Sequence, residues 1–420
     1  MKPVRRALAC LVLLGASALS AQVTVIRAGR LLDPASGAVA RDQVILVENG
    51  KVTAVGPSVA IPKGAAVVDL SQKTVLPGLF DVHTHLCLDL KTQGGNGLQE
   101  LLHSLLAATA IETTAYRALE GAANARDMLR SGFTTVRDVG NAGNYADTAL
   151  RRAIEDGIVP GPTVVNAGRI ITPYGGQYHG IPPERADIAI PEYLYADTPD
   201  EMRKAVRENI TFGAKVIKIV VDDQPYLYSV DDVRTIVKEA AAGGLKVAAH
   251  CATDEGARTA AEGGVASVEH AYRATTPTLQ VMKEKGTFLV GTDFTRQAAH
   301  EMGMDEYHGW VVDRLKRAYQ VGVPVAFGTD VCFVKDGETR GTLSVEFVTS
   351  FVEAGVSPRQ ILQAMTVNAA RLLGMEKERG TIAPGYAADI VATAGNPLDN
   401  VDAIRHVTFV MKGGQVFRNE

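Results

Sequence analysis

The chain has 420 residues, of which 46% are hydrophobic, and its formal net charge at pH 7 is −4. This length suits a protein with a large core, built as two or three domains or as one large barrel with attachments. The mildly acidic balance, without a basic stripe or a block of like charges, argues against a nucleic-acid-binding protein.

Residues 1–21 have the pattern of a secretory signal peptide. Three basic residues lie within the first six positions, and the apolar stretch that follows, residues 7–19, is too short to span a bilayer. We expect cleavage after Ser20 or Ala21, and export of the mature chain to a bacterial periplasm. No later segment has a transmembrane pattern.

The two flanks of the mature chain are expected to form short strands. In residues 23–72, apolar runs alternate with turn signals such as Asn49-Gly50. Residues 380–420 have the same pattern. Neither segment is long enough to bury both faces of a sheet alone. We therefore predict one small β-sandwich domain formed by both termini, residues 22–75 plus 376–420.

Residues 76–375 alternate short apolar runs with amphipathic stretches, the pattern of βα units with parallel strands. Eight such units predict an α/β fold with a closed (β/α)8 TIM barrel. The runs are residues 75–83, 134–139, 163–170, 214–221, 245–250, 266–270, 287–291 and 324–329. Glycines that end the preceding helices are expected at Gly132, Gly213, Gly244, Gly264, Gly286 and Gly322.

Residues of metal-ligand type gather at the ends of these runs. His83 and His85 end the first run, His250 ends the fifth, His270 ends the sixth, and Asp330 follows the eighth. Side chains two positions apart on a strand share a face, so the first pair can reach one ion. Taken alone, two histidines at this spacing are as typical of half-exposed strand residues as they are of a metal site. As a set at the catalytic end of a barrel, the five predict a metal site.

Lys218 interrupts the apolar run Val216-Ile-Lys-Ile-Val220 and shares the face of its two valines. Burial lowers the pKa of an ammonium group, and a neutral amine can add carbon dioxide to give an anionic carbamate. Such an anion can bridge two cations. An outward-facing or salt-bridged lysine is the structural alternative.

The charges of these residues favour two divalent ions, with zinc as the expected metal. Two ions bring four positive charges, whereas the carbamate, Asp330 and a bridging hydroxide bring three negative charges. The remaining positive charge can stabilise the oxyanion that forms when water attacks an amide. No G-x-S-x-G nucleophile motif competes for this role.

The chain resembles the amidohydrolase superfamily, in its binuclear branch with a carboxylated lysine. It is most similar there to prolidase-like dipeptidases and carboxypeptidase-like amidases, which include ochratoxin-degrading amidohydrolases. The resemblance extends over nearly the whole mature chain. The strings that carry it are Leu76-Pro-Gly78, Ser131-Gly-Phe-Thr-Thr-Val-Arg-Asp138, Val247-Ala-Ala-His250, Val268-Glu-His270 and Gly328-Thr-Asp330.

The resemblance implies a role for each predicted ligand. His83, His85 and Asp330 would bind the more buried metal, His250 and His270 would bind the second, and Lys218 would bridge both. Asp330 would also take the proton of the bridging water and pass it to the leaving amine.

Three residues are candidates for binding the substrate's carboxylate. Tyr228 matches a tyrosine that contacts substrate in the similar subgroup. His179 and Arg296 lie on loops after strand ends and could supply a cation. The subgroup often has a Gly-Gly-His string after the third strand, but here the sequence is Gly175-Gly-Gln-Tyr-His179, which displaces the histidine.

We therefore predict a secreted zinc-dependent amidohydrolase that releases the C-terminal amino acid from dipeptides or N-acyl amino acids. Ochratoxin A, cleaved to ochratoxin alpha and phenylalanine, is a candidate substrate suggested by the resemblance. The attacking group would be a metal-bridging hydroxide. We expect a small-molecule substrate, no nucleic-acid or membrane partner after signal cleavage, and a homo-oligomer. A cyclic-amide or imidazolone-type hydrolase and a metal-free barrel used for binding or assembly are the alternatives.

Overall fold

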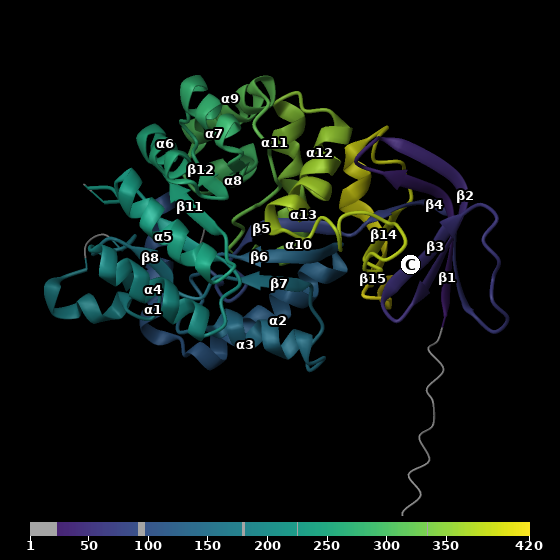
Figure 1. Cartoon of the computed structure of the whole chain (residues 1–420), viewed down its shortest axis with the longest axis horizontal. Coiled ribbons are helices and arrows are strands. Elements are labelled where there is room, and N and C mark those ends of the chain that lie inside the picture. Colours follow the sequence, from purple (N-terminus) through teal and green to yellow (C-terminus); the bar gives the residue numbers. More distant parts are fainter. Residues whose placement is uncertain (1–22, 91–96, 179–180, 225, 334) are drawn as a thin grey trace, which may run out of the picture.

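The computed structural model describes residues 23–90, 97–178, 181–224, 226–333 and 335–420 (Figure 1). The predicted signal peptide, residues 1–21, lies outside this part of the chain, as does His179. Strands from both termini gather at one end of the molecule, next to the barrel. Within the described residues, no helix combines the length and the apolarity that crossing a bilayer requires.

Seven strands from the two ends of the chain form one continuous sheet, in the order β16-β15-β14-β4-β1-β2-β3. Ile26, Ile45, Val75 and Phe409, from four of these strands, belong to one buried apolar cluster. The sheet therefore curls around a core of its own, and the predicted separate sheet domain from both termini is confirmed. Its residue boundaries stay a prediction. The strands are β1 (Thr24–Asp33), β2 (Ala38–Glu48), β3 (Lys51–Gly56), β4 (Ala66–Pro77), β14 (Ile390–Thr393), β15 (Val407–Lys412) and β16 (Gln415–Asn419).

The barrel consists of seven parallel strands and one extended segment, residues 324–329. This segment closes the ring, because Leu289 pairs with Val325 on one side and Val82 N donates to Phe327 O at 2.9 Å on the other. Lys215 N donates to Asn166 O at 2.7 Å and joins the two halves of the sheet. The predicted TIM barrel is confirmed. Its strands are β5 (Leu79–Thr84), β6 (Phe133–Asp138), β7 (Thr163–Asn166), β10 (Ile217–Val220), β11 (Val247–Cys251), β12 (Ser267–His270) and β13 (Phe288–Val290).

Two short strands extend the barrel sheet beside β10. They are β8 (Ile170–Thr172) and β9 (Tyr193–Tyr195), which pair with each other, while Ile171 of β8 pairs with Ile219 of β10. The predicted third run, residues 163–170, therefore contains β7 and the first residue of a separate strand. Because β8 runs parallel to β10, the residues directly after β8 lie at the end of the barrel where β10 terminates.

Helices surround the barrel strands (Figure 1). All six glycines predicted to end helices have positive φ, for example 90° at Gly264 and 86° at Gly322. Side-chain caps fix other ends, such as Thr198 and Glu201 in a reciprocal box at the start of α4. The helices are α1 (Gly97–Ile111), α2 (Thr114–Arg130), α3 (Ala146–Glu155), α4 (Pro199–Thr211), α5 (Val230–Ala242), α6 (Asp254–Gly263), α7 (Thr276–Lys285), α8 (Arg296–Glu301), α9 (Asp305–Val321), α10 (Arg340–Glu346), α11 (Val348–Glu353), α12 (Pro358–Ala364) and α13 (Val367–Leu373), with 3-10 helices η1 (Pro183–Ala189) and η2 (Val401–His406).

The chain passes from the terminal sheet into the barrel at Gly78. Its amide donates to Asp389 O at 2.9 Å, and a Cβ atom there would lie 2.1 Å from Thr134 Oγ1. Only glycine fits at this position. The predicted first run, residues 75–83, is divided here between β4 and β5. The second part, β5, carries the histidine pair to the other end of the barrel.

Candidate metal centre

The six predicted ligand side chains line one cavity of about 220 Å³. Five of them lie at or directly after the C-terminal ends of β5, β11, β12 and residues 324–329, and Lys218 lies within β10. The barrel thus brings together side chains from distant parts of the sequence, as predicted for such a fold. The six are His83, His85, Lys218, His250, His270 and Asp330.

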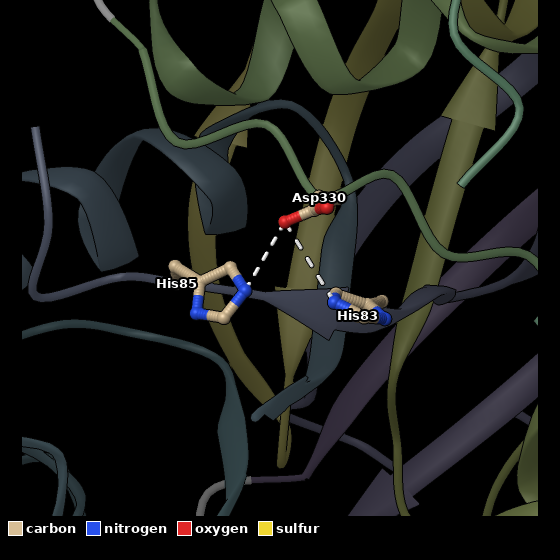
Figure 2. Close-up of side chains that lie close together, drawn as sticks. All are labelled: His83, His85 and Asp330. Carbon is tan, nitrogen blue, oxygen red and sulfur yellow. Dashed lines mark ion pairs between the residues drawn. The ribbon is translucent and has the colours of Figure 1, made fainter. Parts of the chain in front are cut away.

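His83, His85 and Asp330 form the first group of donor atoms (Figure 2). Asp330 Oδ1 lies 3.1 Å from His85 Nε2 and 3.7 Å from His83 Nε2. His83 Nε2 is buried and has no hydrogen-bond partner among the described residues, which is costly unless another group binds it. Ligands about 2.1 Å from one divalent ion are separated from each other by about 3–4 Å. The group therefore fits a metal ion.

Buried contacts hold the two chain segments of this group together. Asp81 Oδ1 accepts from His83 N and from Thr329 N, both at 3.1 Å. Burial raises the pKa of Asp81 to about 7. A Cβ atom at Gly328 would lie 2.8 Å from His83 Cβ, so a glycine is needed where the segment that leads to Asp330 passes β5.

His250, His270 and Lys218 complete the cavity. The His270 ring centroid lies 4.4 Å from that of His250 and 4.9 Å from that of His83. Lys218 is only 2% exposed, and its burial lowers the pKa of the ammonium group. A lowered pKa increases the fraction of neutral amine, which is the form that reacts with carbon dioxide.

Three of the four histidines have their Nδ1 atom beside a protein oxygen outside the ligand set. His83 Nδ1 donates to Glu269 Oε2 and His85 Nδ1 donates to Gly140 O, both at 2.7 Å, and His270 Nδ1 lies 2.9 Å from Thr292 Oγ1. Such outer contacts fix the tautomer and the orientation of metal-binding imidazoles. Burial and then Lys218 lower the pKa of His83 to about 4, so its Nε2 carries a lone pair at neutral pH.

Glu269 was missed from the sequence, although a charged residue inside the buried strand β12 was a usable signal. It pairs with Arg137, whose Nη2 lies 2.8 Å from Glu269 Oε1, and both side chains are buried. Burial opposes the charge, but Arg137 and the hydrogen bond from His83 outweigh it and lower the pKa of Glu269 to about 2. Within the described residues, Arg137 does not form an ion pair with the adjacent Asp138. Asp138 instead accepts from Leu86 N, because neighbouring strand residues point to opposite faces.

We predict that Glu269→Gln lowers the free energy of unfolding by about 3 kcal/mol, because Arg137 is left buried without a countercharge. The measurement is chemical denaturation of the chelator-treated protein, so that lost metal does not contribute. Glu208→Gln is a matched control, since the Arg169–Glu208 pair is partly exposed and is expected to contribute less than about 1 kcal/mol. Equal losses in both variants would contradict the prediction.

The predicted substrate-binding residues do not line the cavity as the structure describes it. Tyr228 is 3% exposed and its hydroxyl donates to Ala196 O at 2.7 Å. Arg296 begins α8 with a side chain that is 75% exposed and lies 3.3 Å from Glu353 Oε2. His179 lies outside the described residues. A role for these three in substrate binding stays a prediction.

Several residues at the site have backbone angles that favour glycine. His270, Thr292 and Asp330 have φ values of 63°, 47° and 61°. Positive φ is unusual for non-glycine residues and is a real outlier for a β-branched residue such as Thr292. Strain of this kind persists only where the surrounding structure enforces it, and it gathers at functional sites.

The amidohydrolase family matches residues 74–417 of the chain. Ochratoxinase from Aspergillus niger is 29% identical over 96% of this chain and 88% of its own length. Imidazolonepropionase from Geobacillus thermodenitrificans is 26% identical over 90% of each chain. A solved Xaa-Pro dipeptidase with methionine bound in its active site has a TM-score of 0.82 at 27% identity, over 95% of this chain and 100% of that one. These matches span the barrel and the terminal sheet.

Proposed function

Because the chain belongs to the amidohydrolase family, we propose that it is a metal-dependent hydrolase that cleaves dipeptides or N-acyl amino acids and releases the C-terminal amino acid. The observation that carries this proposal is the convergence of six ligand-type side chains on one cavity, with His83 Nε2 left open toward it. Similarity to ochratoxinase and to a Xaa-Pro dipeptidase supports this substrate class.

The donor atoms of His83, His85 and Asp330 lie close enough together to hold one divalent ion, and we propose that the whole set of six holds two. His83, His85 and Asp330 would hold one ion, His250 and His270 would hold the other, and Lys218, as a carbamate, would bridge them. When bound, two such ions, zinc in our proposal, activate a water molecule and polarise the scissile carbonyl group. Imidazole and carboxylate donors are typical of zinc sites in proteins.

Asp330 is proposed to move the proton. Burial opposes its charge, but the contacts with His83 and His85 outweigh burial and lower the pKa of Asp330 well below its usual value, so it is ionised at neutral pH. An ionised carboxylate can accept the proton of the attacking water. Asp330 then delivers that proton to the nitrogen of the leaving amine, which completes hydrolysis of the amide bond.

The cavity favours a small substrate with an apolar part. Its volume of about 220 Å³ lies below the range of about 300–1,000 Å³ that is usual for drug-sized ligands. Leu88, Leu90, Leu105 and Ile170 are part of its lining. We infer that an aromatic or aliphatic side chain of the substrate packs against them.

One observation favours the second candidate, a hydrolase of cyclic amides. Among the lining residues that the structure describes, Lys218 is the only lysine or arginine, and it belongs to the proposed ligand set. No other lysine or arginine of that lining is therefore available to anchor a linear substrate's carboxylate. Similarity to imidazolonepropionase supports this alternative. A metal-free binding role is disfavoured, because all six ligand residues are present.

We also propose export to a bacterial periplasm, directed by residues 1–21, and assembly into a homo-oligomer. Removing residues 1–21 is expected to retain the protein in the cytoplasm of an expressing bacterium. Cell fractionation with the full-length gene as the control tests the first point.

The function is tested with a panel of dipeptides, N-acyl amino acids, ochratoxin A and cyclic amides. We expect the zinc-loaded enzyme to hydrolyse linear members, to contain about two ions per chain, and to lose activity when a chelator removes them. Readdition of zinc should restore hydrolysis. Full activity of the metal-depleted protein would contradict the metal centre, and cleavage of the cyclic amides alone would favour the second candidate.

A further inference from the structure

Asn141 lines the cavity but does not belong to the proposed ligand set. It follows β6 at the C-terminal end of the barrel strands, and it is only 8% exposed. Its Nδ2 atom is buried and has no hydrogen-bond partner within the described residues. A buried amide nitrogen in this state is costly unless a ligand accepts its hydrogens. The lining thus contains a hydrogen-bond donor that the protein itself leaves open.

Tyr193 is the neighbouring protein group that could compete for this donor. Burial raises the pKa of Tyr193, and the nearby Asn141 amide partly opposes that rise. The Tyr193 hydroxyl donates to Gln177 Oε1 at 3.2 Å, but among the described contacts no hydrogen bond joins its oxygen to Asn141 Nδ2. The two groups are therefore close without being paired, and a variant at Tyr193 can separate their roles.

A buried ion pair fixes the backbone around Asn141. Arg117 pairs with Glu192, and both side chains are buried. Arg117 also donates to Asn141 O, and Glu192 Oε2 accepts from Gly143 N at 3.0 Å. Asn141 has a φ of 52°, a conformation that asparagine tolerates better than most residues. The ion pair thus holds both sides of this turn and fixes the point from which the amide enters the cavity.

The same turn contacts the proposed ligand set. Gly140 O accepts from His85 Nδ1 at 2.7 Å, and Gly140 O and Asn141 Cα belong to one planar peptide unit. Asn141 therefore lies beside His85, whose Nε2 is 3.1 Å from Asp330 Oδ1. Asn141 and His85 also line the same cavity. The open donor is consequently next to the group of ligands at which a substrate must react.

We propose that Asn141 is a catalytic residue that donates a hydrogen bond to the oxygen of the scissile carbonyl group. This inference rests on the proposed function, because the carbonyl must lie against the ligand set for water to attack it. As the water oxygen bonds to the carbonyl carbon, one electron pair of the C=O bond moves to the carbonyl oxygen. A donor fixed in advance binds that charged oxygen more strongly than the neutral carbonyl. The pair then re-forms the C=O bond while the C–N bond breaks and the amine takes the proton from Asp330.

This role differs from anchoring a substrate carboxylate. Linear and cyclic candidate substrates share the scissile carbonyl, whereas only the linear ones have a C-terminal carboxylate. A donor to the carbonyl therefore acts on both substrate classes, and its contribution appears in kcat. An anchor of the carboxylate would instead act mainly through KM.

The test is Asn141→Gly, because glycine accepts the positive φ and keeps the backbone acceptor for Arg117. The substrates are leucylphenylalanine, N-acetylphenylalanine and the cyclic amide pyrrolidinone. For each substrate that the zinc-loaded wild type hydrolyses, we expect kcat to fall about 10- to 100-fold in the variant, with KM changed by less than about twofold. Metal content should match the wild type.

Ligand binding gives a second readout that needs no turnover. The phosphinate analogue of leucylphenylalanine has a tetrahedral phosphorus and a charged oxygen in place of the scissile carbonyl, whereas the reduced analogue has CH2–NH and no oxygen there. Calorimetric titration should show that Asn141→Gly binds the phosphinate about 10- to 100-fold more weakly and the reduced analogue as the wild type does. A merely structural role of Asn141 would weaken both analogues and overturn the inference.

Asn49→Gly is the matched control, because Asn49 has a φ of 51° and is exposed in the terminal sheet. It should leave kcat unchanged, and so should Tyr193→Phe. An equal loss in Tyr193→Phe and Asn141→Gly would mean that Asn141 acts only by supporting that hydroxyl. That result, a normal kcat in Asn141→Gly, or a higher KM at unchanged kcat overturns the inference and leaves the proposed function standing. Hydrolysis of none of the substrates by the wild type counts against the proposed function, and the inference then falls with it.

Discussion

Lys218→Ala is expected to lose metal and activity together, with kcat/KM falling by about 10³-fold or more. The six ligand residues contain only one carboxylate, Asp330, so two divalent ions need the negative charge of a carbamate to be held side by side. Alanine removes that charge and leaves a space in the buried lining. Metal analysis after zinc loading, performed together with kinetics, measures both losses.

Chemical rescue separates the carbamate from a merely structural lysine. Acetate or propionate can place a carboxylate in the space left by Lys218→Ala, and we expect either acid to restore part of the metal content and of the activity. Lys215→Ala is the matched control, because Lys215 is exposed just before β10. A Lys218→Ala enzyme with two ions and normal turnover would exclude the bridging role.

The barrel was predictable because each βα unit carries its own local signals. The apolar runs, the amphipathic stretches and glycines such as Gly264 and Gly322 are set by neighbouring residues. The amphipathic pattern predicts helices over residues 199–211, 230–242 and 276–285, and α4, α5 and α7 match these ranges residue for residue. Because there are eight βα units, a closed barrel could be predicted from their number. The curl of the terminal sheet was not predictable in this way, because it depends on contacts between strands from opposite ends of the chain.

Breaks within predicted elements have tertiary causes. The amphipathic pattern of residues 358–373 predicts a single helical segment, but the structure divides it into α12 and α13. Phe327 N donates to Ala364 O, and Phe80 N donates to Met365 O at 2.8 Å, so carbonyls that would continue the helix bind barrel strands instead. Thr366 lies between the two helices with φ −136°. No local pattern in the sequence predicts these long-range hydrogen bonds.

The ligand residues could be predicted from the sequence, whereas the residues that support them could not. Strand ends of a TIM barrel converge, so position alone brings His83, His250 and Asp330 to one site. Glu269 and Asn141 act through pairings with residues from other strands and helices, which sequence spacing does not encode. Loop residues are harder still, because a loop's direction is set by what it packs against.

Asp330→Asn is expected to keep the fold while kcat falls by about 10²- to 10⁴-fold. Asparagine has the same shape and tolerates the φ of 61° found at this position. The backbone hydrogen bond from residue 330 N to His83 O, 2.8 Å long, is also unaffected. The amide oxygen can still contact a metal, but it cannot accept and deliver the proton of the attacking water.

Turnover of Asp330→Asn is measured at saturating zinc, alongside metal content and thermal unfolding, and Asp330→Ala serves as the comparison. Alanine removes the donor oxygen as well, so we expect it to lose metal at the His83–His85 group, whereas the asparagine variant should retain metal there. This contrast separates ligation from proton transfer, because only the second function is missing from a metal-loaded asparagine variant. Near-normal turnover in that variant would assign the proton transfer to another group and leave Asp330 as a ligand alone.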